Sequence, residues 1–191
     1  MIHISEVFYT IQGEGMWTGT PAVFVRLAGC NLSCDFCDTD YSLKRVMSLE
    51  QVIDAVRDAS PDCPMVVLTG GEPLAQRESL ALIEALRRDG RRVHIESNGT
   101  IEASLPDDVW LCVSPKERVD RRMAARANEA KFIVDGRVPE EHLSLFTHLQ
   151  TLLLQPEGNK PHNVEIALAY ARAHPHRFRL SLQTHKLIGV R

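Results

Sequence analysis

The chain has 191 residues, of which 44% are hydrophobic and 25% are charged, and its formal net charge is −3. This length and composition are typical of one globular domain with a single core, here expected over residues 1–191. The small negative charge argues against a protein dedicated to binding nucleic acid. No run approaches the roughly 20 apolar residues that span a bilayer, and the first residues lack the features of a signal peptide. We therefore expect no membrane partner.

The chain contains five cysteines, an odd number, and three of them fall within eight residues. With no secretion signal, this crowding favours a metal or redox site over a disulfide framework. It also predicts that the protein works in a reducing cytoplasm.

The sequence predicts strands alternating with helices. The first clear strand is 22–28. A helix begins at Ser48, which forms a capping box with Gln51, and is followed by a short apolar strand at 65–68. A second helix at 80–88 ends before Gly90. Further strands are expected at 93–95, 109–113, 131–134, 152–154 and 178–182, with a helix at 164–173 before the last.

This alternation predicts right-handed βαβ units and a mainly parallel sheet. A complete eight-fold barrel takes about 250 residues, so the expected fold is α/β, an abbreviated, open partial barrel. Polar segments follow the strands directly: CNLSC, TGGEP, ESNGT, SPK, QPEG and QTHK. Sites of such folds lie at the carboxyl ends of the strands, where we expect these segments to converge.

Cys30, Cys34 and Cys37 follow the first predicted strand in a C-x3-C-x2-C pattern. A tight loop can place three thiolates on three corners of an iron–sulfur cube, leaving the fourth iron open to a small molecule. The alternative is structural zinc, which usually takes its ligands in pairs from separated segments. No second CxxC is present, and Cys63 and Cys112 lie in apolar surroundings typical of ordinary buried cysteines.

The three-cysteine pattern resembles the signature of the radical S-adenosylmethionine superfamily, in which the methionine group of the cofactor binds the open iron. The run Thr69-Gly70-Gly71-Glu72-Pro73 is similar to the glycine-rich motif that contacts the methionine amino group. Glycines let the backbone approach a ligand closely, and polar groups must meet its ammonium.

A narrower resemblance covers nearly the whole chain. FYTIQGEG, PAVFVRLAGCNLSCDFCDTD, TGGEP, ESNG, CVSPK, LLQPEG and SLQTHK are similar, in the same order, to segments of the 7-carboxy-7-deazaguanine synthase family. This family converts 6-carboxy-5,6,7,8-tetrahydropterin into 7-carboxy-7-deazaguanine and ammonia in queuosine and 7-deazapurine biosynthesis. Some relatives carry a long insertion between the first two cysteines, which this chain lacks.

The resemblance implies a radical carbon–nitrogen lyase that uses a [4Fe–4S] cluster, S-adenosylmethionine and Mg²⁺. The cofactor is split to a 5′-deoxyadenosyl radical and regenerated in each turnover, so no protein side chain is assigned as catalytic. The family's other properties imply a small homodimer with flavodoxin or ferredoxin as electron donor.

The expected site residues fall into three groups and are carried over by the resemblance, except Glu14, expected from its chemistry, and Glu96 and Asn98, expected from their place at a strand end. Substrate contacts are expected from Ile11, Gln12, Gly13, Glu14, Arg26, Thr69, His185 and Arg191. Cofactor contacts are expected from Phe36, Cys37, Asp38, Gly71, Ser114, Pro115, Lys116, Gln155, Pro156, Glu157 and Gly158, with Glu96 and Asn98 as further candidates at the ribose. Metal ligands are Cys30, Cys34 and Cys37 for the cluster and Thr39 for Mg²⁺.

The residue types suit these roles. Gln12 can both donate to and accept from a pterin edge, and Glu14 can accept from its amino and imino groups. Arg26 can bind a carboxylate as a bidentate fork. Two alternatives stay open: a glycyl-radical activating enzyme of the same superfamily, which would consume its cofactor, and a zinc-stabilised binding module.

Overall fold

In a computed structural model, which describes residues 1–191, the chain divides into two compact units. The first, called here the N-terminal unit, comprises Met1–Ile11, Pro21–Ser97 and Ala103–Trp110. The second, the C-terminal unit, comprises Gln12–Thr20, Asn98–Glu102 and Leu111–Arg191. The expectation of a single domain stays a prediction.

The N-terminal unit is built on a sheet with the strand order β3-β1-β2-β4-β5. Its strands are β1 (Ile2–Ile11), β2 (Pro21–Leu27), β3 (Arg45–Met47), β4 (Met65–Gly70) and β5 (Arg92–Ser97). β2, β4 and β5 run parallel, whereas β1 pairs antiparallel with both β2 and β3. Val66, Val67 and Leu68 of β4 are fully buried, as expected for a central parallel strand.

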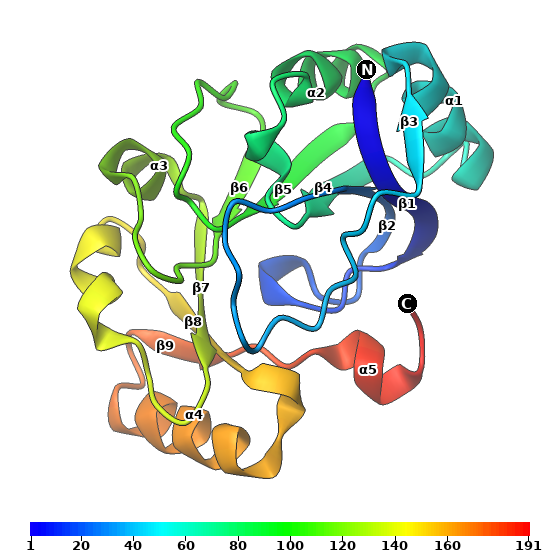
Figure 1. The fold of residues 1–191 in the computed structure, drawn as a ribbon. Coiled ribbons are helices and arrows are strands. Elements are labelled where there is room, and N and C mark those ends of the chain that lie inside the picture. The colour runs from blue at the N-terminus through cyan, green and yellow to red at the C-terminus, as the bar shows by residue number, and fades with distance from the viewer. The chain divides into compact units, whose positions relative to one another are not determined.

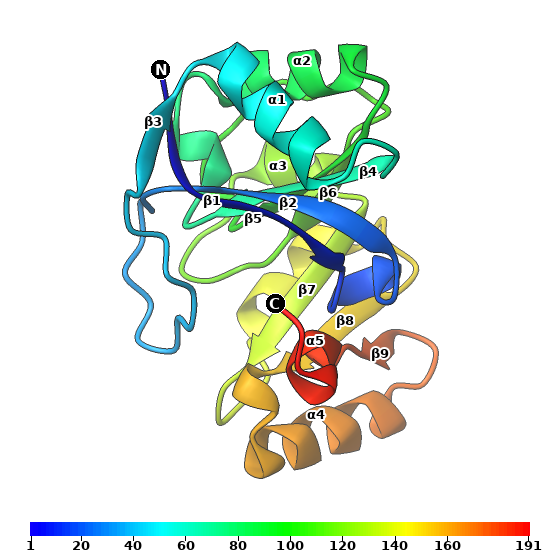
Figure 2. The ribbon, with the colours of Figure 1, turned by 90° about the vertical axis from the view of Figure 1, so that its right-hand side faces the viewer.

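Two helices pack on one face of this sheet, as Figure 2 shows: α1 (Leu49–Ala59) and α2 (Ser79–Arg88). Ser48 caps α1 and forms the predicted capping box with Gln51. α2 ends at Asp89, and Gly90 follows with a positive φ of 80°. A single-turn 3-10 helix, η2 (Pro73–Ala75), lies between β4 and α2.

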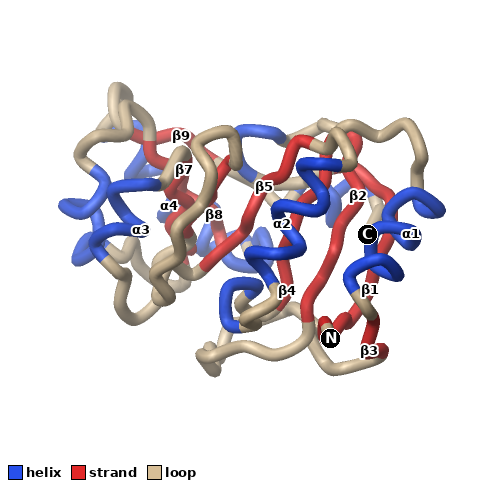
Figure 3. Tube along the Cα trace, turned by 90° about the horizontal axis from the view of Figure 1, so that it is seen from above, coloured by secondary structure: helices blue, strands red, loops and turns tan.

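The C-terminal unit has a parallel sheet with the order β6-β7-β8-β9 (Figures 1 and 3). Its strands are β6 (Trp110–Val113), whose first residue belongs to the other unit, β7 (Glu129–Val134), β8 (Leu152–Pro156) and β9 (Phe178–Leu180). The helices are α3 (Arg121–Arg126), α4 (Pro161–Ala173) and α5 (Thr184–Ile188), with 3-10 turns η1 (Gly15–Trp17), η3 (Glu140–Phe146) and η4 (Glu157–Asn159). α4 packs against β7, β8 and β9.

Every strand and helix expected from the sequence is present, with ends shifted by a few residues. β1, β3, α3 and α5 were not expected. β1 alternates irregularly between buried and exposed positions and is shifted in register between Ile4 and Glu6, so it lacks a clean two-residue period. None of the helices combines the length and apolar character needed to cross a bilayer.

Candidate active site

The three clustered cysteines lie in a long loop between β2 and β3. The loop is closed at its base, where the Gly29 N–H donates to the Tyr41 carbonyl at 2.9 Å. Within it the Cys37 N–H donates to the Cys34 carbonyl at 3.1 Å, and the Leu32 N–H donates to Cys30 Sγ at 3.4 Å. These bonds order a loop that has no regular secondary structure.

All three thiols of this loop are free; those of Cys30 and Cys34 are half-buried and that of Cys37 is exposed. Electrostatic interaction with the thiolate form of Cys37, then desolvation and smaller interactions with Cys30 and Cys34, raise the pKa of the Tyr41 phenol. The Tyr41 side chain of the same loop thus interacts with all three cysteines. Three accessible thiols in one loop are the donor set that an iron–sulfur cluster with one open corner requires.

A single metal ion would need different geometry. No group of three or more His, Cys, Asp or Glu side chains is arranged to hold one ion. Ligands of a zinc ion must converge on a point, whereas ligands of a cluster bind separate irons and lie further apart. Cys63 and Cys112 are buried, with 5% and 2% of their surface exposed, as expected for core residues. The zinc alternative is therefore not favoured.

The glycine-rich segment after β4 packs directly against the start of the cysteine loop. A Cβ added at Gly71 would lie 2.5 Å from the Cβ of Cys30 and would also clash with the Gly29 carbonyl. The Glu72 N–H donates to the same carbonyl at 3.1 Å. Gly71 is thus required for this close approach, which joins the two motifs named in the sequence.

The Glu72 side chain of the same motif is fully buried. Its carboxylate accepts from Ser97 Oγ at 3.0 and 3.1 Å and from the Leu74 N–H at 3.0 Å. These bonds link the segment after β4 to the end of β5, so the buried carboxylate stabilises the glycine-rich motif.

Arg26 and Thr69 are register partners on the neighbouring parallel strands β2 and β4, so their side chains share a face. Arg26 is anchored on that face by two contacts. Its Nε donates to Glu6 Oε1 at 2.7 Å, and its guanidinium carbon lies 5.8 Å from the centre of the Phe8 ring. Two of the three predicted substrate residues of this unit therefore lie side by side; the third is Ile11.

The remaining predicted residues of this unit, apart from Ile11, Gly71 and Glu96, lie within the cysteine loop. Phe36 and Thr39 are half-buried, and Asp38 is exposed. Hydrogen bonds from Ser42 lower the pKa of the neighbouring Asp40 to about 2. Thr39 stands between Asp38 and Asp40 in the sequence of this loop, and hydroxyl and carboxylate oxygens are of the kind that Mg²⁺ prefers.

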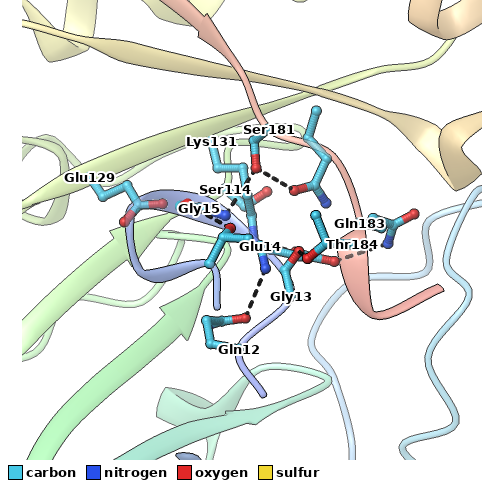
Figure 4. Close-up of polar contacts among 12 residues, drawn as sticks. Gln12, Gly13, Glu14, Gly15, Ser114, Glu129, Lys131, Ser181, Gln183 and Thr184 are labelled. Carbon is cyan, nitrogen blue, oxygen red and sulfur yellow. Dashed lines mark hydrogen bonds and ion pairs between the residues drawn. The ribbon is translucent and has the colours of Figure 1, made fainter. Parts of the chain in front are cut away.

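In the C-terminal unit, the segment QGEG forms a turn stabilised by several elements (Figure 4). Gln12 Oε1 accepts from the Glu14 N–H at 3.1 Å, and the Gly15 N–H donates to Ser181 Oγ at 2.9 Å. The Met16 N–H donates to Glu129 Oε1 at 3.2 Å. The three consecutive N–H groups of Glu14, Gly15 and Met16 are therefore all bonded to side chains.

The Glu14 carboxylate is the centre of this polar cluster. It forms an ion pair with Lys131 Nζ at 2.5 Å and accepts from Gln183 Nε2 at 3.0 Å. Burial alone would raise the pKa of Glu14, but the charge of Lys131 and hydrogen bonds from Lys131, Gln183 and Gln155 outweigh it and lower the pKa to about 2. Glu14 is therefore ionised at any physiological pH.

The end of the chain returns to the same turn. The Thr184 N–H and Oγ1 both donate to the Gly13 carbonyl, at 2.9 and 2.8 Å. A Cβ added at Gly13 would lie 2.6 Å from the Cβ of His185, so Gly13 is required for this contact. Ile11 is the last residue of β1, and Arg191 is exposed at the terminus.

The other predicted cofactor residues of this unit follow β6 and β8. Lys116 Nζ donates to Ser114 Oγ at 2.7 Å across the SPK segment. Gln155 is 3% exposed and accepts from Ser181 Oγ at 3.2 Å. In the segment after β8, Glu157 pairs with Lys160 at 2.5 Å, and Gly158 has a positive φ of 59°.

Two candidates at the end of β5 are placed differently from the rest. Asn98 Oδ1 accepts from both the N–H and the Oγ1 of Thr100, at 2.9 and 2.7 Å, which is a local turn. Glu96 is half-buried and is the last residue but one of β5.

Two residues of the polar cluster, Glu129 and Lys131, were not expected from the sequence, whereas Ser181 and Gln183 lie in the SLQTHK segment of the resemblance but were given no role. Glu129 and Lys131 are two apart on β7, so they point to the same face. Two charged residues on one face of an otherwise apolar strand were the sequence signal that could have indicated a buried polar cluster. The partner of Lys131, Glu14, lies 117 residues away along the chain, which a local pattern does not reveal.

Comparisons with known proteins agree with this geometry. Residues 24–111 match the model of the Radical SAM superfamily. The chain is 40% identical over 194 residues to a 7-carboxy-7-deazaguanine synthase from Bacteroides thetaiotaomicron, with 100% of both chains covered. It is 33% identical to one from Rickettsia prowazekii, covering 99% of this chain and 88% of that protein.

Solved structures are similar as well. The structure of QueE from Escherichia coli matches with a TM-score of 0.81 and 29% identity, covering 95% of this chain and 93% of that one. Streptococcus suis SuiB matches with a TM-score of 0.57 at 10% identity, covering 80% of this chain and 46% of that one, a likeness of fold alone.

The open, mainly parallel α/β fold and the three-cysteine loop packed on a glycine-rich motif define a radical S-adenosylmethionine enzyme. Identity over the full length is more specific. The chain belongs to the 7-carboxy-7-deazaguanine synthase family. The expected fold class, an open partial barrel of the radical S-adenosylmethionine type, is confirmed, as are the [4Fe–4S] cluster and S-adenosylmethionine as the cofactors of its family.

Proposed function

We propose that this chain converts 6-carboxy-5,6,7,8-tetrahydropterin into 7-carboxy-7-deazaguanine, with release of ammonia, as a step toward queuosine or another 7-deazapurine. The observation that carries the proposal is full-length similarity to synthases of this name. The contact of Gly71 with the cysteine loop supports it, because it brings the cluster ligands and the glycine-rich motif together. The activating-enzyme alternative is not favoured, since the relatives named here are synthases.

When bound, the cluster and S-adenosylmethionine supply the carbon-radical chemistry that ring contraction needs. The role of the protein side chains is to hold the pterin in one orientation. Arg26 is placed to bind the carboxylate, because Glu6 takes its Nε and no hydrogen bond within the chain uses its Nη nitrogens. Thr69 lies beside it as a second polar contact.

In the C-terminal unit, we assign the pterin edge to Gln12 and Glu14. Glu14 is ionised and can only accept hydrogen bonds, which suits the amino and imino donors of the pterin. The other carried-over contacts, Ile11, Gly13, His185 and Arg191 for substrate, and Phe36, Cys37, Asp38, Gly71, 114–116 and 155–158 for cofactor, remain part of the proposal.

We further propose Thr39 as a ligand of Mg²⁺, a homodimer as the working form, and flavodoxin or ferredoxin as the electron donor. The five free cysteines support a reducing cytoplasm as the place of action. Each is an independent part of the proposal, with its own support in the family resemblance.

The deciding experiment is anaerobic turnover after cluster reconstitution, with the tetrahydropterin, reductant, Mg²⁺ and substoichiometric S-adenosylmethionine. Several 7-carboxy-7-deazaguanine molecules per cofactor molecule would support both the synthase and cofactor regeneration. Cofactor cleavage without this product would overturn the substrate assignment and favour the activating-enzyme alternative. Consumption of one cofactor per product would overturn regeneration alone.

A further inference from the structure

Two charged residues of β7, Glu129 and Lys131, bind the QGEG turn and the residue after it. Both side chains belong to residues that are almost fully buried, with 4% of Glu129 and 4% of Lys131 exposed. Glu129 accepts from the Met16 N–H, and Lys131 pairs with Glu14. A buried cation and a buried anion are costly to place in a strand, so their contacts require an explanation.

We propose that Glu129 and Lys131 are positioning residues that hold the QGEG turn, and with it Gln12 and Glu14, in the form that binds the pterin. The proposal rests on the substrate assignment above. Neither residue needs to contact the substrate, since each acts through the turn.

The contacts are specific to this turn. Gly15 has a positive φ of 73°, and a Cβ at this position would clash with Glu129 Oε1. The glycine therefore both permits the backbone conformation and leaves room for the carboxylate beneath it. Two residues that follow β9 also bind the turn: Ser181 Oγ accepts from the Gly15 N–H, and Gln183 Nε2 donates to Glu14. Residues of β7 and of the C-terminal segment therefore both stabilise the turn.

The Lys131 ammonium also sets the charge state of the proposed pterin acceptor. Without a cation, burial would favour the protonated form of Glu14, which would then present a donor in place of one acceptor. Other titratable groups border the turn: Glu129 from β7, His185 beside Gly13, and Lys186, whose Nζ donates to Gln183 Oε1 at 2.9 Å. A test of Lys131 must separate Glu14 from these groups.

The main variant is Lys131→Met, which keeps an unbranched side chain one atom shorter and removes the charge. Binding of 6-carboxypterin, a stable aromatic analogue of the substrate, would be measured from pH 5.5 to 8 on the reconstituted enzyme. Hydrogen exchange of the peptide covering residues 12–20 would be measured in parallel. Arg137→Met is the matched control, because it removes a cation from the exposed pair with Glu141 in the same unit.

We expect Lys131→Met to weaken 6-carboxypterin binding by about tenfold or more, increasingly so as the pH falls, and to speed exchange in residues 12–20. The double variant Glu14→Gln, Lys131→Met should lose the added pH dependence, since the titrating carboxyl is gone while His185 and Glu129 remain. Lys131→Arg should restore most of the binding. A role in folding alone would change exchange and stability without this pH dependence.

Wild-type affinity, pH profile and exchange in Lys131→Met would overturn the proposal. Should Lys131→Met fail to fold, the same measurements would be made on Lys131→Arg and on the double variant Glu14→Gln, Lys131→Met. Failure of the substrate assignment is distinguishable, because the wild-type enzyme itself would then neither bind 6-carboxypterin nor form 7-carboxy-7-deazaguanine.

Discussion

Glu6 holds the guanidinium of Arg26 across the β1–β2 pair. The two residues are register partners on antiparallel strands, and Arg26 Nε lies 2.7 Å from Glu6 Oε1. Because the bond uses Nε, the two Nη nitrogens retain their donors. The Phe8 ring below the guanidinium fixes its plane further. Glu6 therefore determines how Arg26 presents its fork to a carboxylate.

Replacing Glu6 by Gln should weaken substrate binding while leaving the chemistry intact. The neutral amide is a weaker acceptor than the carboxylate, so the guanidinium loses part of its orientation, at a cost of about 1 kcal/mol. We expect KM for the tetrahydropterin to rise about fivefold, with kcat changed little. Glu84→Gln, which alters an exposed pair with Arg87, is the control. An unchanged KM in Glu6→Gln would show that Arg26 needs no partner.

Serine substitutions should separate the cluster ligands from the other cysteines. Cys30→Ser, Cys34→Ser and Cys37→Ser each remove a thiolate from the loop, so each should reduce the iron and labile sulfide retained after reconstitution. Cys63→Ser and Cys112→Ser alter buried thiols outside the loop and should retain a full cluster. Iron and sulfide analysis under anaerobic conditions measures both sets. A full cluster in any of the first three variants would contradict the ligand assignment.

Much of the N-terminal site is readable from the sequence because its signals are local. Three cysteines within eight residues and a TGGEP run after an apolar strand each identify a chemical group and its place on the fold. Arg26 is visible for the same reason, since a charged residue interrupts a strand of apolar neighbours. The strands that carry these groups are buried on both faces, and continuous apolar runs of this kind are the easiest strands to recognise.

The partners of these groups could not be predicted, because they are brought together only by the fold. Glu6 lies in β1, whose irregular burial pattern hides the strand itself. Lys131 and Glu14 are far apart in sequence, and the local pattern around either residue does not predict the other as its partner. Glu72 lies in the glycine-rich motif, but the motif does not reveal that its side chain bonds to Ser97. Side-chain pairing across elements is decided by register and packing, which a single sequence does not encode locally.

Gly71→Ala should disrupt cofactor binding without a large effect on folding. The added methyl group would meet the Gly29 carbonyl and the Cys30 side chain, so the glycine-rich segment and the cysteine loop must move apart. We expect at least a tenfold loss of S-adenosylmethionine affinity, measured by equilibrium binding to the reconstituted protein. Gly90→Ala is the control: its φ is +80° but its surroundings are open, so it should cost about 1 kcal/mol of stability and leave cofactor affinity unchanged. Wild-type affinity in Gly71→Ala would show that the contact is not required.

The stability of the chain should fall as the pH drops from 7 to 5, in part because of His94. This residue is buried on β5 and stacked on Trp110; desolvation, with a smaller contribution from the charge of Arg92, lowers its pKa from 6.5 to about 4. Between these two values the unfolded chain binds a proton that the folded chain does not, so stability present above pH 6.5 is progressively lost on acidification.

The size of this effect is set by the difference between the two pKa values, and between pH 7 and 5 it amounts to roughly 2 kcal/mol. Urea unfolding of wild type and His94→Gln at both pH values measures it. The neutral amide cannot take up the proton, so the variant should lose about 2 kcal/mol less than wild type over this interval. His176→Gln alters an exposed imidazole and should follow the wild-type dependence. Equal pH dependence in His94→Gln and wild type would mean that His94 is protonated as readily in the folded chain as in the unfolded one.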